Sequence, residues 1–347
     1  MRSCDATDML KTNVGGVGHS LMAIERSVVT LAVGMPVYWR MAINLARSFM
    51  WWHKQSDIRF SIVTDFPNPL PRDLAGIGIV RVSSDKLGKG FSAKLCLDEL
   101  SPAPKTLFID ADCLIVGNLE SVFSRFTGRA VSVVGGTITG GEWFGDVGSI
   151  CSRFGVAGLP KFNGGMYYLE QGSLARDVYA CARELQRHYD ELGLVRLRGQ
   201  PNDELLMAIS MSLHRLEAIP EDGTIMSDPQ ACPSELEVSV LRGRSRLVNP
   251  RPPDRRHRPW YPFHIVHPLV VHFLGNYTSG WRYRAEATKL ELAMERGWPA
   301  SLAEGFVGAT FSARQQAAEV SKNLARPLYH AIFGPRKVVR SPRLSCE

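Results

Sequence analysis

The feature that most constrains the fold is an alternation of short apolar runs with helical patterns in the first third of the chain. The apolar runs are nearly continuous, which is typical of strands buried on both faces of a parallel sheet. Strand patterns lie at 27–34, 58–65, 78–84 and 106–116, and helical patterns at 38–53 and 91–100. This succession predicts an α/β fold, with a mostly parallel central sheet flanked by helices.

The remainder of the chain carries the same signals at wider spacing. We expect a strand at 161–172, a helix at 173–189, a helix start at 201–211 with Asn202 or Asp203 as its N-cap, a loop at 242–262, a strand at 263–275 and helices at 283–296 and 312–325.

Two carboxylates, Asp110 and Asp112, interrupt the apolar run "KTLFIDADCLIV" at 105–116. A buried charge is costly unless it is paired or bound to a metal. If the strand ends at Asp110 and a turn begins at Ala111, both carboxylates face the edge of the sheet where ligands of such folds bind. Paired carboxylates there suit a hard divalent cation that also takes phosphate oxygens. A chance surface turn is the alternative.

Two further segments carry polar residues beside glycines. His272 ends the apolar run "LVVHFLG" and is a candidate metal ligand, although a core histidine is the alternative. In "FNGGMYY", Asn163 offers a donor and an acceptor, and Gly164 and Gly165 permit close approach of the backbone. An ordinary strand opening is the alternative for this second segment.

The net charge of +7 is unevenly distributed. Residues 242–258 hold seven arginines against one aspartate, and residues 311–347 hold seven basic residues against two acidic ones. An anionic membrane surface or a phosphorylated ligand fits these segments, and a solvated loop and tail are the alternative. No nucleic-acid-binding motif is present, so we expect no nucleic acid partner.

The N-terminus and the cysteines bear on the compartment. No apolar run approaches the length of a membrane span, and the first residues lack the order of a signal peptide. Seven cysteines are scattered without a CxxC pair, as expected for reduced thiols. These observations predict a cytoplasmic protein, and the basic segments predict peripheral contact with the inner face of a membrane.

Taken in order, the segments resemble a GT-A glycosyltransferase of family 8, the group that contains glycogenin and bacterial lipopolysaccharide galactosyl- and glucosyltransferases. The resemblance spans roughly residues 28–285 and is most specific at 91–123 and 270–275. It implies a Rossmann-like nucleotide-diphospho-sugar transferase fold. It also implies a UDP-sugar donor and Mn²⁺, or Mg²⁺, bound by an Asp-X-Asp motif and a distant histidine.

Carried over residue by residue, the resemblance assigns a site. The metal ligands are Asp110, Asp112 and His272. The expected donor-binding residues are Ala32, Val33 and Tyr38 at the uracil, Lys94 near the diphosphate or sugar, Asp110 and Ala111 of the motif, Asn163 and Gly164 at the sugar, and Gly275 and Arg282 at the diphosphate.

The sequence departs from the family pattern at two places. The family's Asp-Gln-Asp segment appears as Asn202-Asp203-Glu204, so we expect Asp203 beneath the anomeric carbon, with Glu204 as the alternative. The final loop lacks the family's lysine, and Arg282, Arg284 or an arginine of 242–258 is the candidate replacement.

The predicted function is therefore a retaining, Mn²⁺-dependent transfer of a hexose from a UDP-sugar to a glycan, lipid-linked or protein acceptor. A HAD-type phosphohydrolase with Asp110 as nucleophile is one alternative, and a catalytically silent nucleotide-sugar-binding protein is the other. The expected organisation is a poorly ordered segment 1–27, one catalytic domain 28–300 and a basic helical tail 301–347. Within the domain, 28–123 form the nucleotide-binding half and 124–285 the donor and acceptor half.

Overall fold

The computed structural model describes residues 24–83, 87 and 90–334. A central six-stranded sheet has the order β3-β2-β1-β4-β9-β6, and β3, β2, β1 and β4 run parallel while β9 is antiparallel to both of its neighbours. Its strands are β1 (Arg26–Ala32), β2 (Arg59–Thr64), β3 (Gly78–Arg81), β4 (Lys105–Ile109), β6 (Val131–Ser132) and β9 (Met166–Glu170). The predicted α/β fold with a mostly parallel sheet is confirmed.

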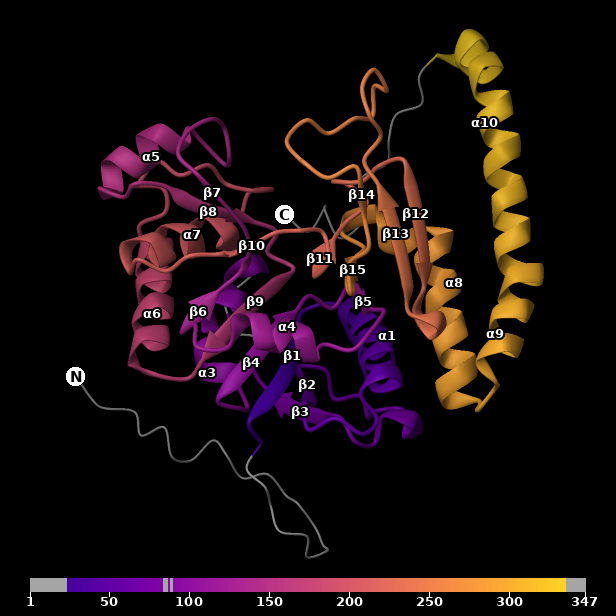
Figure 1. Ribbon diagram of the computed structural model, residues 1–347, viewed down its shortest axis with the longest axis horizontal. Helices are drawn as coiled ribbons and strands as arrows, with labels where there is room; N and C mark the ends of the chain where they lie inside the picture. The colour runs from indigo at the N-terminus through magenta and orange to yellow at the C-terminus, as the bar shows by residue number, and fades with distance from the viewer. Residues whose placement is uncertain (1–23, 84–86, 88–89, 335–347) are drawn as a thin grey trace, which may run out of the picture.

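Helices cover both faces of this sheet (Figure 1). Along β4, Leu107 and Ile109 pack into the cluster that contains α1 (Pro36–Trp52), whereas Phe108 packs into the cluster that contains α6 (Ser173–Arg187) and α7 (Asp203–Leu213). Because successive side chains of a strand point to opposite faces, an unbroken apolar run here serves two cores.

Three small sheets extend the structure. They have the orders β10-β7-β8, β11-β15-β5 and β12-β13-β14. Their strands are β5 (Cys113–Ile115), β7 (Val134–Ile138), β8 (Leu159–Phe162), β10 (Ile219–Pro220), β11 (Met226–Ser227), β12 (Glu235–Ser239), β13 (Arg244–Val248), β14 (Ile265–Val266) and β15 (Val270–His272).

The remaining helices are mostly short. They are η2 (Arg72–Leu74), η3 (Gly90–Cys96), α3 (Leu97–Leu100), α4 (Glu120–Phe126), α5 (Val147–Phe154), η4 (Val240–Arg242), η5 (Gly275–Ser279), α8 (Trp281–Leu290), η6 (Glu291–Glu295), α9 (Ala300–Val307), η7 (Gly308–Ser312) and α10 (Ala313–Phe333). The described part of the chain contains no helix with the length and hydropathy that a membrane span requires.

Several element boundaries differ from the sequence predictions. The predicted strand 106–116 divides into β4 and β5 with a turn between them, and 161–172 divides into β8 and β9. The helix predicted at 91–100 is largely the 3₁₀ segment η3, and the loop predicted at 242–262 contains β13. Strand β1 already begins within the segment 1–27, whose residues 1–23 lie outside the described part of the chain.

Candidate active site

The two motif carboxylates lie in the turn between β4 and β5. β4 ends at Ile109, and the Cys113 amide donates to the Asp110 carbonyl at 3.0 Å, which closes the turn. The Asp110 side chain is 22% exposed and the Asp112 side chain 8%. The expectation that a turn presents both carboxylates at the strand end is confirmed, because the apolar residues on either side pack into the core while the turn faces a cavity.

His272 reaches these carboxylates through strand pairing. β15 runs antiparallel to β5 with His272 opposite Cys113, and the Phe273 amide donates to the Asp112 carbonyl at 2.9 Å. The His272 Nε2 lies 3.1 Å from Asp112 Oδ1 and 3.8 Å from Asp110 Oδ2. Residues separated by about 160 positions in the chain therefore share one buried cluster.

A chain of side-chain hydrogen bonds orients the imidazole. His272 Nδ1 lies 2.9 Å from Asn163 Oδ1, which also accepts from the Gly165 amide at 2.9 Å. Asn163 Nδ2 donates to Asp228 Oδ2 at 3.0 Å, so both ends of the amide have a matched partner. Since an amide oxygen only accepts, the proton of a neutral His272 sits on Nδ1 and the Nε2 lone pair faces the carboxylates.

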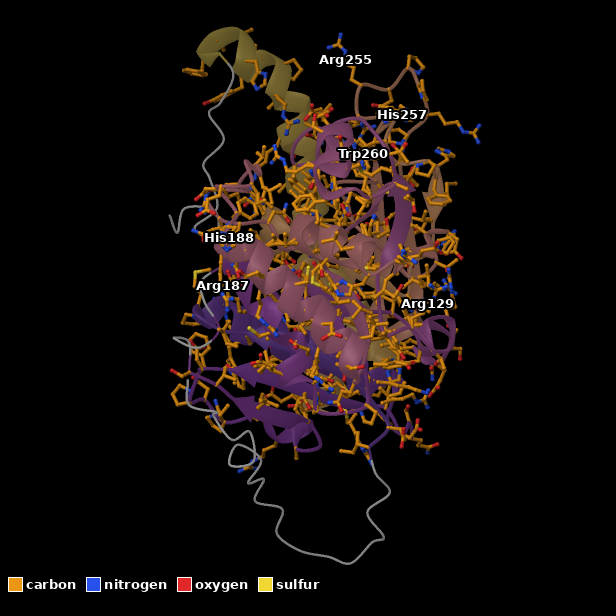
Figure 2. All side chains as sticks on the ribbon, turned by 90° about the vertical axis from the view of Figure 1, so that its left-hand side faces the viewer. Arg129, Arg187, His188, Arg255, His257 and Trp260 are labelled. Atoms are coloured by element: carbon orange, nitrogen blue, oxygen red, sulfur yellow. The ribbon has the colours of Figure 1, made fainter. Side chains whose placement is uncertain are left out.

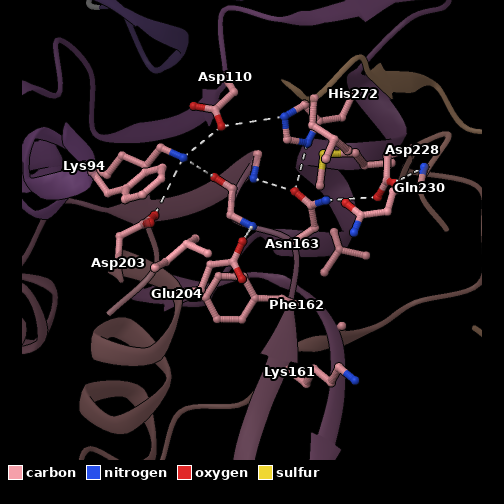
Figure 3. A pocket seen from close by; sticks show the side chains of 18 of the residues that line it. Lys94, Asp110, Lys161, Phe162, Asn163, Asp203, Glu204, Asp228, Gln230 and His272 are labelled. Carbon is pink, nitrogen blue, oxygen red and sulfur yellow. Dashed lines mark hydrogen bonds and ion pairs between the residues drawn. The ribbon is translucent and has the colours of Figure 1, made fainter. Parts of the chain in front are cut away.

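Lys94 connects the motif to the far side of the cavity (Figure 3). Its Nζ lies 2.8 Å from Asp110 Oδ2, 2.8 Å from the Gly164 carbonyl and 3.6 Å from Asp203 Oδ2. Burial disfavours the ammonium, but the carboxylates of Asp110 and Asp203 outweigh it and raise the pKa of Lys94. The lysine is a fixed cation between the two carboxylates.

Asp203 and Glu204 open helix α7, whose N-cap is Asn202, as predicted. Asp203 is 3% exposed and its Oδ2 accepts from the Tyr167 hydroxyl at 2.7 Å. Glu204 Oε1 accepts from the Gly164 amide at 2.8 Å. Burial, with the nearby Asp203 carboxylate, raises the pKa of Glu204 to about 7. Glu204 therefore titrates near neutral pH, as a group used in proton transfer or charge stabilisation would.

The two positions after Asn163 must be glycine, because other side chains of the site approach the backbone closely there. A Cβ at Gly164 would lie 2.9 Å from Glu204 Cγ, and one at Gly165 would lie 2.5 Å from His272 Nδ1. These separations are shorter than van der Waals contact, so any side chain here would displace the groups that form the site. The Asn-Gly-Gly turn thus joins the histidine side of the cavity to the α7 side.

These groups line one cavity of about 1670 Å³. Of the predicted donor-binding residues, Val33, Tyr38, Lys94, Asp110, Ala111, Asn163, Gly164 and Gly275 line it. Ala32 does not line it, because it is fully buried behind the cavity wall, where its carbonyl accepts from Thr64 Oγ1 at 2.7 Å. Arg282 is a wrong assignment: it lies on α8, stacks on Trp281 and faces Glu319 of α10 at 3.8 Å, away from this cavity.

The donor set fits a hard divalent cation. Ligand atoms of Asp112, Cys113 and His272 lie within 4.8 Å of one another, and Asp110 adjoins them. Burial and the neighbouring carboxylates raise the pKa of the Cys113 thiol well above its usual range, which disfavours thiolate ligation. Two carboxylates and one imidazole remain, a set compatible with Mn²⁺ or Mg²⁺ that keeps open positions for phosphate oxygens.

The charges of the cluster also suit a bound divalent cation. Burial raises the pKa of Asp110, and the nearby Asp112 carboxylate adds to this effect against the opposing Lys94. Burial alone would lower the pKa of His272, but its contact with Asp112 outweighs burial and raises it. Two carboxylates that both face His272 therefore need compensating positive charge, which Lys94 and a protonated His272 supply in the protein alone.

Sequence reasoning missed one residue of the site, Asp228. Asp228 follows β11, is 8% exposed, and holds Asn163. Its carboxylate also accepts from the Gln230 and Ala231 amides. Cys113 is a fully buried core residue whose sulfur adjoins the carboxylate cluster. Asp228 had no sequence signal, because the segment around it has no motif.

No protein-family model and no curated protein matches the sequence. Similar solved structures include an active-site mutant of LgtC, with a TM-score of 0.47 and 16% identity, covering 72% of this chain and 87% of that chain. The galactosyltransferase LgtC in complex with donor and acceptor sugar analogs has the same TM-score and identity, with coverages of 82% and 95%. The apo glycosyltransferase GlyE of Streptococcus pneumoniae TIGR4 has a TM-score of 0.38 and 15% identity, with coverages of 57% and 46%. Likeness at this level establishes neither family nor activity.

Proposed function

We propose that this chain is a GT-A glycosyltransferase of family 8 that transfers a hexose from a UDP-sugar to an acceptor with retention of configuration and with Mn²⁺. The observation that carries the proposal is the convergence of Asp110, Asp112 and His272 at one wall of a cavity that also contains Lys94 and Glu204. A metal-binding cluster beside a fixed cation suits a diphosphate, whose charge it can neutralise.

Each residue has a physical role in this proposal. Asp110, Asp112 and His272 would hold the divalent ion, which supplies positive charge to a departing diphosphate. Asn163 and Asp228 hold His272 in the tautomer that directs Nε2 at the carboxylates. Lys94 keeps Asp110 and the Gly164 carbonyl in place.

Asp203 and Glu204 are the two candidates for the polar group beneath the anomeric carbon. Asp203 was preferred on the sequence, but its Oδ2 is occupied by Tyr167 and Lys94 and the residue is almost fully buried. Glu204 is more accessible. We therefore place Glu204 nearer the sugar and assign Asp203 to the positioning of Lys94. Asp203→Asn should then raise KM for the donor, whereas Glu204→Gln should lower kcat.

The test is a panel of UDP-sugars incubated with the full chain and Mn²⁺, with and without EDTA. Metal-dependent release of UDP, faster when glycan acceptors are added, supports transfer. Donor binding without turnover would instead identify a silent binding protein. Hydrolysis of phosphomonoesters without UDP-sugar binding would identify the phosphohydrolase alternative, with Asp110 as its nucleophile.

We also propose peripheral contact of α10 with an anionic membrane. In Figure 1, α10 runs along the edge of the molecule, and none of its described residues is buried. Val320, Leu324, Leu328 and Ile332 are 58 to 77% exposed and recur every four residues, which forms one apolar stripe. Basic residues follow in the C-terminal segment. We assign a smaller part of this contact to the arginines of 242–258, because Arg242, Arg246 and Arg256 pair with Glu304, Glu235 and Asp254.

A further inference from the structure

The cavity is larger than one donor molecule needs. Small-molecule sites are typically about 300–1,000 Å³, whereas this cavity holds about 1670 Å³. Figure 3 shows Lys161 at the opposite end of the drawn part from Asp110. Lys161 lines the cavity together with Phe144, Arg198 and Trp260, none of which belongs to the metal and sugar-binding groups described above. This second region has room for another ligand.

Aromatic surface is exposed in the second region. Trp260 is 51% exposed although it lines the cavity. Its loop is fixed by Asn249, which is 2% exposed, donates to the carbonyls of Arg258 and Tyr261 and accepts from the Arg258 amide. The indole is therefore presented by a preorganised loop. A flat, exposed aromatic face of this kind suits the apolar face of a sugar ring, with polar groups at its edge.

The same region contains cations without acidic partners. Among the described residues, no carboxylate pairs with Lys161 or Arg198, and the Lys161 ammonium lies 5.7 Å from the centroid of the Trp260 ring. The loop that carries Trp260 also holds Arg251 and Arg255, which lie outside the cavity lining and form no ion pair with any described residue. Figure 2 shows Trp260, His257 and Arg255 at one end of the molecule. The acids that line this region are Glu142 and Glu221, and burial raises the pKa of Glu221.

Backbone strain supports a binding role. The described residues include three non-glycine positions with positive φ, and two of them, Phe144 at 52° and Arg198 at 54°, line this cavity. Such conformations are costly and concentrate at ligand-binding sites. Phe144 contributes an aromatic ring that also packs against the core containing α6 and α7, and Arg198 contributes a guanidinium to the cavity lining.

We propose that this region is the acceptor subsite and that the acceptor is an anionic saccharide, stacked on Trp260 with its acidic group at Lys161 and Arg198. The proposal rests on the glycosyltransferase function, since it places the acceptor in the same cavity as the donor. The acidic group is a carboxylate, as in a uronic acid, or a phosphate ester. In either case the acceptor hydroxyl oxygen forms a bond to the anomeric carbon of the hexose, the bond from that carbon to the diphosphate breaks, and the hydroxyl proton passes to the released diphosphate.

The test uses pairs of probes that differ only in charge. The full chain is incubated with UDP, Mn²⁺ and either p-nitrophenyl β-glucuronide or p-nitrophenyl β-glucoside, and binding is followed by saturation-transfer NMR. A second pair, glucose 6-phosphate and glucose, distinguishes phosphate from carboxylate. We expect an acidic probe to bind at least about tenfold more tightly than its neutral partner, with the preference decreasing as salt rises. Equal binding of both members in both pairs would overturn the proposal.

Substitutions test which residues cause the preference for the acidic probe. Lys161→Gln and Arg198→Gln should each remove most of the preference for the acidic probe. Arg187→Gln is the matched control, because Arg187 is an exposed arginine on α6 that pairs with Glu184 and does not line the cavity. A preference unchanged by both cavity variants would also refute the assignment. UDP affinity is measured in parallel: if UDP binds but no charge preference exists, the proposed function stands and the subsite fails, whereas absence of UDP binding rejects both.

Discussion

Asn163 Oδ1 accepts from His272 Nδ1 at 2.9 Å, although the two residues lie 109 positions apart in the chain. The contact decides which imidazole nitrogen faces Asp112. A histidine on a strand end has no preferred tautomer by itself, so this amide converts a candidate ligand into an oriented one.

Asn163→Ala should lower the affinity for Mn²⁺ by about 10- to 100-fold, because it removes the acceptor that holds His272. Isothermal titration calorimetry with Mn²⁺ and UDP measures this directly. Asn118→Ala is the control, since Asn118 is exposed and only caps the Glu120 amide. Unchanged Mn²⁺ affinity in Asn163→Ala would mean that the strand pairing of β15 orients His272 without help.

Asp112→Ala should abolish Mn²⁺-dependent binding of UDP and leave the fold intact. Asp112 lies in a turn and contributes a carboxylate to the cluster, whereas the flanking apolar residues form the core. Donor titrations with and without EDTA, together with far-UV circular dichroism, check both parts. Asp222→Ala removes an exposed carboxylate that pairs with Arg125 and should change neither measurement. Wild-type donor affinity in Asp112→Ala would refute the metal assignment.

Gly165→Ala should disrupt Mn²⁺ binding through a steric effect. The added Cβ would lie 2.5 Å from His272 Nδ1 and 3.1 Å from Asn163 Oδ1, so the imidazole must move. Gly136→Ala is the matched control, since nothing lies within 4 Å of its Cβ. Calorimetry with Mn²⁺ compares the two. Equal effects of the two substitutions would contradict the steric account.

Glu204→Gln should stabilise the metal-free protein and lower kcat. Because the pKa of Glu204 is raised to about 7 in the folded chain, folding favours the protonated carboxyl. The penalty of ionising it is absent below about pH 4.5, grows between about pH 4.5 and 7, and is complete above that range. Removing the charge should therefore raise the free energy of unfolding by about 3 kcal/mol at pH 8, but should change it little at pH 4.

Denaturant unfolding at the two pH values, beside the rate of UDP release, tests this prediction. Glu191→Gln is the control, since Glu191 is an exposed carboxylate that does not line the cavity. A stability change that is the same at pH 4 and pH 8 would rule out the titration of Glu204 as its cause.

Leu324→Asp combined with Leu328→Asp should weaken binding to phosphatidylglycerol vesicles at least about tenfold, because burial of each leucine in the interface contributes about 1.5–3 kcal/mol. Both side chains are more than 65% exposed, so folding and UDP binding should be unaffected. Vesicle sedimentation measures the effect, and Leu174→Asp on α6 is the control. Equal sedimentation of the double variant and the wild type would exclude α10 as the membrane contact.

The fold class and the carboxylate turn could be predicted because both depend on local sequence. Buried parallel strands are continuously apolar, so Asp110 and Asp112 stand out from the run that contains them. The helix predicted at 91–100 was less accurate, because its first six residues belong to the 3₁₀ segment η3. β13 was missed inside an arginine-rich stretch, because only one side of a strand at a sheet surface is buried.

Long-range contacts determine the positions of site residues that the sequence did not predict. Arg282 follows the histidine loop closely in sequence, yet α8 turns it toward α10, and nothing local specifies that direction. Asp228 has no motif, but the pairing of β11 with β15 brings it next to Asn163. The sequence alone determined which strand carries the carboxylates, since hydrophobic burial is a local pattern. Only the tertiary structure decided the tautomer of His272 and which other charged side chains lie beside these carboxylates. Both depend on the pairing of strands that are far apart in the chain.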